Sequence, residues 1–374
     1  MLKKITDFHK QTKIEIMTKK LILLFVLLIA GQSLIAQQKI RVIKATSKIV
    51  DIRDGTDFKK ANWTINPGLK PDIYQTNNKA ITFYTDIDSI SLKVKLDHKY
   101  NFIILLNGKD SAYTQIVCMP SYLDMLKKAS KYNLNDKREI TKFTYTPMND
   151  SDLVVIRTVF KLDSIIGTGN EVSKLLNMMH WVHNAFPHDG SKEIPGYASV
   201  SDLMKRCIQD HGTLHCGALA WVLNDCYLAL GWKSRHVICL PKDSTDFDCH
   251  SIISVYSTTL NKWLWIDPTN DAYVMNEKGE LLSIAEVRER LINDKPLILN
   301  PEANWNHRNS VTKDEYLYNY MAKNLYAIQC YVTGGGESKS NVLLPVEYKG
   351  IIPRTRENKP KCTNSPAVFW AKPE

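Results

Sequence analysis

Three side chains in one stretch of the chain could act together as a catalytic group: the thiol of Cys216, the imidazole of His250 and the carboxylate of Asp267. They lie in the segments LHCGALAW (214–221), DCHSIISV (248–255) and KWLWIDPT (262–269). A thiol attacks a carbonyl carbon as the thiolate, and a neighbouring imidazole is the usual base that removes its proton. A carboxylate fixes the tautomer and orientation of such an imidazole. These residue types, in this order, predict a cysteine-nucleophile active site.

The segment that follows Cys216 predicts a helix. Residues 217–231 carry apolar side chains at helical spacing, are rich in Ala and Leu and contain no Pro, and Gly231 is a typical helix end. Cys216 is therefore expected at a helix N-terminus. Free backbone N–H groups and the helix dipole favour an anion there and lower the pKa of a thiol. The same N–H groups could hold an oxyanion that develops on a substrate carbonyl.

The other two segments predict a β-hairpin that brings the imidazole to the carboxylate. Residues 250–256 and 262–266 have the composition of strands, and the polar residues 257–261 form the turn between them. Pairing the strands around Thr258 and Thr259 sets His250 opposite Asp267. A slip of one residue would set Pro268 there, so the spacing leaves the register open.

This arrangement resembles the transglutaminase-like superfamily of papain-like cysteine enzymes. The matching pieces are the Cys-Gly at a helix start, the helix end ALGWKSRHV (229–237), the strand led by His250, and WIDPT (265–269). The resemblance covers roughly residues 175–275. It implies an α+β papain-like transglutaminase core in which the Cys-bearing helix packs on an antiparallel sheet. It also implies Cys216 as nucleophile, His250 as general base and acid, and Asp267 as the orienting residue. His215 and Cys249, each one residue before a catalytic position, depart from the family pattern and leave the substrate open.

Three further residues are candidates for the oxyanion hole or the cleft. Papain-like enzymes place an amide side chain a short distance before the nucleophile, and Gln209 lies seven residues before Cys216. An exposed polar residue is the alternative reading of Gln209. Trp181 and Tyr197 could line the cleft, on their sequence positions alone.

A metal site is the rival reading of the same region. Cys207, His211 and His215 are spaced four apart and would share one face of a continuous helix, as zinc ligands can. Gly212 and Thr213 interrupt that helix, however. We therefore expect no metal and no cofactor, with a zinc hydrolase kept as the less favoured alternative.

The first 36 residues have the pattern of a secretory signal peptide. Lys19 and Lys20 precede the ten-residue apolar run LILLFVLLIA (21–30), and a small residue, Ala36, ends the segment. Met17 is a credible true start. The apolar run is short for a membrane span, although an uncleaved anchor is the alternative. We expect an exported protein, periplasmic or extracellular, with no stable membrane span once the signal is removed.

Composition and charge fit an ordinary globular protein, with 44% hydrophobic and 24% charged residues. The formal charge of +10 falls to about +6 without residues 1–36, which hold six lysines and two acidic residues. The remaining surplus is spread thinly, so we expect no nucleic-acid partner. Export permits disulfides, but the eight cysteines show no CxxC pair.

Short alternating apolar runs separated by turn signals predict a β-rich, sandwich-like domain over residues 37–165, with one short helix at 122–132. The runs counted as strands include Val154–Phe160. The catalytic core is expected over 166–300. Residues 301–374 are expected as a C-terminal extension that completes the core sheet, with a flexible hairpin loop at Gly334–Gly336.

Together these features predict an exported transglutaminase-like cysteine enzyme that acts on a peptide or protein, such as a cell-wall peptide, through a thioester acyl-enzyme. Hydrolysis is preferred over transfer to an amine, because water needs no second binding site and the sequence shows none. The alternative is a non-catalytic binding protein of the cell envelope built on the same scaffold. Oligomeric state is not readable from the sequence.

Overall fold

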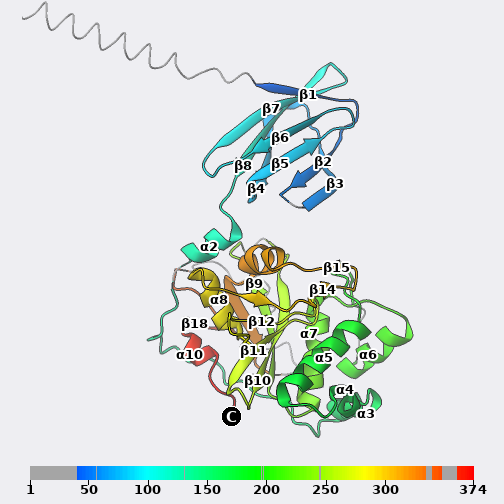
Figure 1. The fold of residues 1–374 in the computed structure, drawn as a ribbon, viewed down its shortest axis with the longest axis vertical. Helices are drawn as coiled ribbons and strands as arrows, with labels where there is room; N and C mark the ends of the chain where they lie inside the picture. The colour runs from blue at the N-terminus through cyan, green and yellow to red at the C-terminus, as the bar shows by residue number, and fades with distance from the viewer. Residues whose placement is uncertain are drawn as a thin grey trace, which may run out of the picture. The chain divides into compact units, whose positions relative to one another are not determined.

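The computed structural model describes residues 40–374, except residues 56, 130, 195, 197, 244–245, 334–338 and 348–359. The chain divides into two compact units, one ending at Met119 and the other beginning at Pro120 (Figure 1). The predicted signal peptide and the predicted loop at Gly334–Gly336 lie outside the described residues. Within the described ranges, no helix has both the length and the apolar character needed to cross a bilayer.

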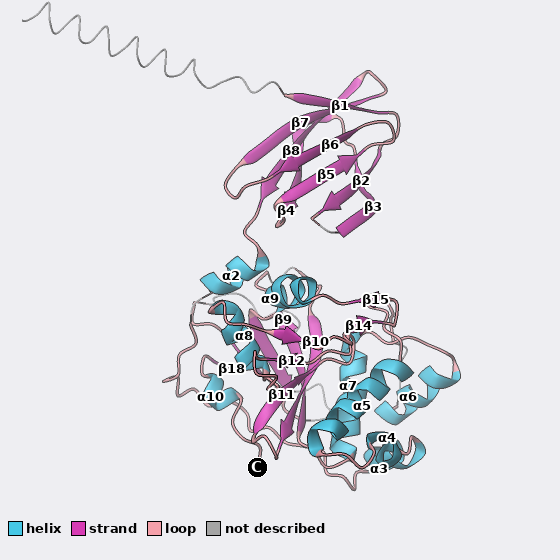
Figure 2. Ribbon diagram, viewed as in Figure 1, coloured by secondary structure: helices cyan, strands magenta, loops and turns pink. Residues whose placement is uncertain are grey.

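The first unit consists of two four-stranded sheets (Figure 2). One has the order β1 (Arg41–Ala45), β7 (Lys99–Leu106), β8 (Asp110–Cys118), β4 (Gly68–Thr76). The other has the order β3 (Asp57–Thr64), β2 (Ile49–Asp54), β5 (Ala80–Tyr84), β6 (Ser89–Lys93). Alternate residues of each sheet enter one shared apolar core, where the rings of Phe83 and Phe102 lie 5.3 Å apart. The period of two that a half-buried strand requires therefore produces a sandwich.

The second unit is built on a six-stranded sheet. Its order is β11 (Lys262–Ile266), β10 (His250–Ser257), β9 (Ser234–Leu240), β16 (Ala327–Tyr331), β17 (Ser340–Leu343), β18 (Lys361–Thr363). All neighbours are antiparallel except β17 and β18, which run parallel. Strands from residues after 300 thus form half of the sheet that carries β10 and β11. Two short ribbons pair β12 (Val274–Met275) with β13 (Ile298–Leu299), and β14 (Asn304–Trp305) with β15 (Asn309–Ser310).

Helices cover both faces of this sheet and give a mixed α+β fold (Figure 2). One apolar core contains side chains of α3 (Ser151–Val159), α4 (Leu162–Ile166), α5 (Glu171–Ala185), α6 (Val200–Gln209) and α7 (Cys216–Ala229). The other contains side chains of α2 (Tyr122–Lys128), α8 (Ile284–Ile292), the π-helix η1 (Asp314–Met321), α9 (Ala322–Asn324) and α10 (Pro366–Phe369). Strand β10 serves both cores, because Ile252 packs into the second core and Ile253 into the first.

The boundary between the units lies near residue 119 rather than near 165 as the sequence predicted. The run Val154–Phe160, expected as a strand, lies in helix α3 of the second unit as far as Val159, and Phe160 is the C-cap of that helix. Asp150 caps this helix by accepting from the backbone N–H groups of Asp152 and Leu153. Leu153 and Ile156, one helical turn apart, are its buried residues. The β-branched composition of the run favoured a strand, but the cap and the packing against α7 override that preference.

Candidate active site

Helix α7 places Cys216 at its first residue, one position before the start predicted from the sequence. The N-cap is His215, whose Nδ1 accepts from the backbone N–H of Ala218 at 3.1 Å. This cap needs the close approach of the ring to Gly217, where an added Cβ would lie 3.1 Å from His215 Cε1. The cap leaves the N–H groups of Cys216 and Gly217 pointing out of the helix end, as the first donors of any helix do. Cys216 is half-buried.

The β10–β11 hairpin positions His250 and Asp267. The observed register pairs Ser257 with Lys262 and Ile253 with Ile266. This register is two residues away from the predicted one, because the observed loop, residues 258–261, is centred one residue later than the predicted pairing around Thr258 and Thr259. A shift of two keeps each side chain on the same face of the sheet, since the strand period is two. His250 and Asp267 are therefore diagonal neighbours on one face, and His250 Nε2 donates to Asp267 Oδ2 at 2.8 Å.

Asp267 is fully buried, and both of its carboxylate oxygens are hydrogen-bonded. Besides the bond from His250, Oδ2 accepts from Tyr316 Oη at 2.6 Å and from Asn270 Nδ2 at 3.0 Å. Oδ1 accepts from the backbone N–H of Thr269 at 2.8 Å. Burial by itself would raise the pKa of Asp267, but the charge of His250 and these hydrogen bonds outweigh it and hold the pKa below its ordinary value.

The π-helix η1 supplies the outer part of this network. Tyr316 accepts from Trp265 Nε1 at 3.2 Å while it donates to Asp267, so three buried side chains form one chain of hydrogen bonds. Tyr320, four residues later, packs edge-to-face on His250 with ring centroids 5.3 Å apart. Neither tyrosine was predicted from the sequence as part of the site. Their spacing of four is a signal for one helix face, but nothing in the sequence indicates which side chain that face contacts.

His250 is the first residue of β10. It contacts Cys216 of α7 and Tyr320 of η1, two helices that pack in different apolar cores of the unit. Its Nε2 is used by Asp267, which leaves Nδ1 for the hydrogen bond to the Cys216 sulfur. Burial alone would lower the pKa of His250, but the Asp267 carboxylate and the Cys216 thiolate raise it to about 10. Burial alone would raise the pKa of Cys216, but hydrogen bonds from His188 and His250 outweigh it and lower the pKa to about 5. A thiolate–imidazolium pair is therefore the favoured state at neutral pH.

His188 is a second imidazole beside the cysteine that the sequence analysis did not identify. Its Nδ1 accepts from Trp305 Nε1 at 3.0 Å, and an indole N–H can only donate. In the neutral ring the proton consequently lies on Nε2, where it can bond the sulfur. A backbone bridge from His188 to Leu214 and a two-way hydrogen bond with Asn306 hold the segment in place. Only this long-range pairing brings His188 to the site, and no local sequence signal reports it.

The residues predicted for the cleft lie elsewhere. Gln209 is exposed at the last residue of α6, and Trp181 packs between Phe160 and Phe186 in the helical layer. Neither is among the residues that line the cavity at Cys216. Tyr197 lies outside the described residues.

The rival metal cluster does not assemble in the structure. His211 has a left-handed backbone (φ 49°), which ends the helical path from Cys207 to His215. His215 Nδ1 is used by the helix cap. Among the residues that the structure describes, no group of three or more His, Cys, Asp or Glu could hold a metal ion. All eight cysteines lie in the described part of the chain, and Cys118, Cys207, Cys216, Cys226, Cys239, Cys330 and Cys362 form no disulfide there.

Cys216 and His250 line a cavity of about 650 Å³ that is large enough for a peptide segment. His188, Trp305 and Tyr320 form part of its wall. Exposed side chains of Phe247, Asp248 and Glu315 also line it, together with Val311. A substrate carbonyl can thus reach the sulfur from solvent, between apolar and acidic side chains.

No family model and no curated protein matches this sequence. Among solved structures, the crystal structure of a putative cysteine protease from Cytophaga hutchinsonii has a TM-score of 0.24 and 18% identity, over 38% of this chain and 49% of that chain. The transglutaminase of red sea bream has a TM-score of 0.24 and 10% identity, over 67% of this chain and 52% of that chain. This chain thus spans about half the length of each. Both likenesses are partial, and the interpretation of the site rests on its own geometry.

Proposed function

We propose that this protein is a transglutaminase-like cysteine enzyme that acts on amide or peptide bonds through a thioester acyl-enzyme. One observation carries the proposal: Asp267 holds His250 through Nε2, so Nδ1 of His250 serves the thiol of Cys216 at a helix N-terminus. This is the division of roles that nucleophilic catalysis by cysteine requires. The cavity at Cys216 supplies the access that an internal ion pair of purely structural function would not need.

In the proposed reaction the Cys216 thiolate attacks the carbonyl carbon of an amide. The C–N bond then breaks while the His250 imidazolium gives its proton to the leaving amine, and a thioester remains on Cys216. Neutral His250 next takes a proton from water as the water oxygen attacks the thioester carbon. Release of the acid restores the thiolate–imidazolium pair. Asp267 stays ionised throughout and orients the ring, because its two oxygens are already bonded.

The oxyanion formed in each step has two sources of stabilisation in this proposal. The backbone N–H of Cys216 at the start of α7 is the first. The second is Nε2–H of His188, which bonds the thiolate before the reaction and can bond the oxyanion once the sulfur has joined the carbonyl carbon. Trp305 fixes the other ring nitrogen of His188. A donor that is oriented before the reaction stabilises developing charge without reorganising, which is why such groups contribute strongly to catalysis.

Hydrolysis is the preferred outcome, because the Cys216 cavity is open to water. The proposed substrate is a peptide or protein, with cell-wall peptides as the first class to test. Export is also a proposal, and it rests on the apolar run 21–30 with its flanking lysines. Mass measurement of the protein recovered outside the cytoplasm tests export, with a mature chain that begins at Gln37 as the expected result.

The direct test of catalysis compares the wild-type protein with Cys216→Ala and Cys216→Ser on a panel of peptides, with products read by mass. We expect amide cleavage by the wild type and none above background by Cys216→Ala. Cys118→Ser is the matched control, because it removes a free thiol in the other unit. Undiminished cleavage by Cys216→Ala would end the catalytic assignment, and an unreactive Cys216 thiol would favour the alternative of a non-catalytic envelope binding protein.

A further inference from the structure

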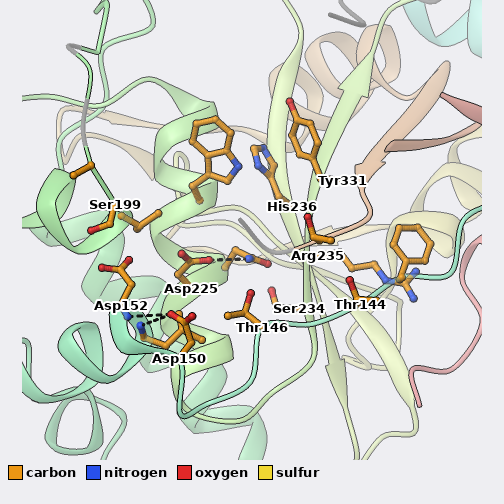
Figure 3. Close-up of a pocket in the computed structure, with 17 residues that line it drawn as sticks. Thr144, Thr146, Asp150, Asp152, Ser199, Asp225, Ser234, Arg235, His236 and Tyr331 are labelled. Atoms are coloured by element: carbon orange, nitrogen blue, oxygen red, sulfur yellow. Dashed lines mark hydrogen bonds between the residues drawn. The ribbon is translucent and has the colours of Figure 1, made fainter. Parts of the chain in front are cut away.

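A second cavity, of about 510 Å³, lies beside the later turns of α7 (Figure 3). Helix α7 contributes Trp221, Asn224 and Asp225 to it, and β9 contributes Ser234 and His236. The remaining wall includes Asp150 and Asp152 at the start of α3 and Tyr331 at the end of β16. As far as the described residues go, this cavity shares no lining residue with the one at Cys216.

Several buried polar atoms of this cavity have no hydrogen-bond partner among the described residues. They are both ring nitrogens of His236, Oδ1 of Asn224 and Oγ of Ser234. The three residues are 6%, 1% and 3% exposed. Native proteins pair nearly all buried polar groups, with other protein groups, with water or with a ligand. A set of unpaired acceptors and donors around one hollow therefore marks a place where something polar binds.

The charge of the cavity is negative. Asp150, Asp152 and Asp225 bring three carboxyl groups to it, and Asn224 Nδ2 donates to Asp225 Oδ1 at 3.1 Å. Burial and the neighbouring His215 keep the pKa of His236 at about 3, so this ring is neutral at physiological pH. The wall consequently contains acceptors and negative charge around a neutral imidazole.

Arg235, the one Lys or Arg among the described lining residues, does not neutralise these carboxyl groups. Its guanidinium donates to Tyr145 Oη and to the Phe369 carbonyl. It also stacks on the rings of Phe143 and Trp263 at 3.8 and 4.1 Å. Figure 3 shows the Arg235 side chain directed away from Asp225, toward the far side of the strand.

Aromatic rings complete the wall. Trp221 and His236 have ring centroids 5.4 Å apart, and Tyr331 lies 5.6 Å from His236 and 6.4 Å from Trp221. The faces and edges of these rings border the same hollow as the Asp225 carboxyl group. Trp and Tyr rings attract a cation through the negative potential of their faces.

We propose that this cavity binds the ammonium group of an alkyl primary amine. Such a group presents three N–H donors, which match the Asp225 carboxylate, Oδ1 of Asn224 and one ring nitrogen of neutral His236. A quaternary ammonium has no N–H and would leave these acceptors unpaired. A metal ion is disfavoured because no group of three or more suitable ligands forms in the described part of the chain. The volume suits a ligand of the size of one or two amino-acid residues, and the proposal does not depend on the chemistry of Cys216.

The test measures binding of n-pentylamine to the full mature protein by calorimetry, at a pH of about 8 and constant ionic strength. The matched neutral probe is 1-pentanol, which has the same chain without the charge. We expect saturable one-to-one binding of n-pentylamine and at least tenfold weaker binding of 1-pentanol. Asp225→Asn should weaken n-pentylamine at least tenfold, and Trp221→Phe should weaken it several-fold. Asp294→Asn, which removes an exposed carboxylate that pairs with Lys127, should leave the affinity unchanged.

Equal affinity for the amine and the alcohol, or an unchanged amine affinity in Asp225→Asn, would overturn the proposal and leave a cavity that holds only water. Circular dichroism and thermal melting establish that each variant is folded. If Asp225→Asn fails to fold, Trp221→Phe decides, because a cation site must lose affinity when the indole is replaced by the less electron-rich phenyl ring. An unchanged affinity in Trp221→Phe would then count against the proposal.

Discussion

The two cavities that share helix α7 differ in how their buried polar groups are paired. At the Cys216 cavity, Asp267 and His250 are more than nine-tenths buried and have partners on each charged group, and Thr269 Oγ1 is the one buried side-chain atom of the described wall without a partner. At the Asp225 cavity, both ring nitrogens of His236, Oδ1 of Asn224 and Oγ of Ser234 lack partners among the described residues. A hydrogen-bond network whose members are all paired fixes the position of its charged groups, whereas unpaired buried groups can bind a polar group from outside. The same helix thus borders both of the sites that we propose.

The largest expected effect comes from breaking the completed network with Asp267→Asn. An amide of the same shape can no longer hold His250 as a charged donor at Nε2, so the ring loses the tautomer that serves Cys216. We expect kcat/KM on a cleaved peptide to fall by about 10⁴-fold. Asp271→Asn, a change of the same type at a carboxylate bonded to His180, is the control and should retain most of the activity. Full activity in Asp267→Asn would mean that the network is only structural.

The corresponding substitution in the other cavity, Asp225→Asn, should stabilise the folded protein at neutral pH. Burial and the nearby Asp152 and Asp150 outweigh the hydrogen bond from Asn224 and raise the pKa of Asp225 to about 7 from 3.8. The folded protein therefore binds more protons than the unfolded chain between these values, and its stability falls as the pH rises through that window. Asp225→Asn removes this loss. The difference in the free energy of unfolding between Asp225→Asn and wild type should therefore increase by about 4 kcal/mol, in favour of the variant, as the pH rises from about 4 to about 8.

Denaturant unfolding at both ends of that window measures the effect. A difference between wild type and Asp225→Asn that does not change with pH would show that Asp225 is not held in an unfavourable state. Saturating n-pentylamine should reduce the difference at the higher pH, since a bound cation stabilises the ionised carboxylate.

Loss of the His188 side chain should reduce kcat/KM less than the substitution of Asp267, but more than the substitution of a surface histidine. His188→Ala removes one hydrogen bond to the thiolate and one donor to the oxyanion, so we expect kcat/KM to fall by about 10²- to 10³-fold. Because that bond lowers the pKa of Cys216, the acid limb of the pH profile should also move to higher pH. His188→Gln should restore part of the rate. The exposed His98 provides the control substitution, His98→Ala. An unshifted acid limb in His188→Ala would contradict the assigned role.

The smallest effect is expected at the helix cap. In Gly217→Ala the new Cβ would lie 3.1 Å from His215 Cε1 and 3.2 Å from Nδ1, so the ring must shift by a few tenths of an ångström, which weakens its bond to Ala218. We expect a loss of about 1 kcal/mol in the free energy of unfolding, the usual value of an N-cap. Thermal unfolding checks this value, and an unchanged midpoint would show that the His215 cap contributes nothing.

Local patterns in the sequence predicted the elements that carry the site, and they failed where distant segments meet. The apolar spacing of 217–231 predicted α7, and strand β11 begins and ends at the predicted Lys262 and Ile266. The hairpin register was wrong by two residues, since the position of the loop depends on backbone conformation, such as the left-handed Asn261 (φ 52°). The face of the sheet on which His250 lies was still predicted correctly, because side chains alternate between the two faces with a period of two residues.

Residues that reach the site from elsewhere in the chain could not be predicted from one sequence. His188, Trp305 and Tyr316 meet Cys216, His250 and Asp267 only through tertiary packing. Gln209 was chosen by its distance along the chain, and the turn after α6 leaves it exposed. The second cavity could not be predicted from the sequence either. Its unpaired atoms belong to residues of α7 and β9, and only tertiary packing brings these residues together.

We infer that His250, held by Asp267, keeps Cys216 as a thiolate. The most direct measurement is the rate of Cys216 alkylation by iodoacetamide as a function of pH, with the modified residue identified by mass. We predict a half-maximal rate near the lowered pKa of about 5 in the wild type. In His250→Ala the midpoint should move toward the value of a free thiol, about 8.5. A wild-type midpoint near that free-thiol value, unchanged in His250→Ala, would contradict the claim.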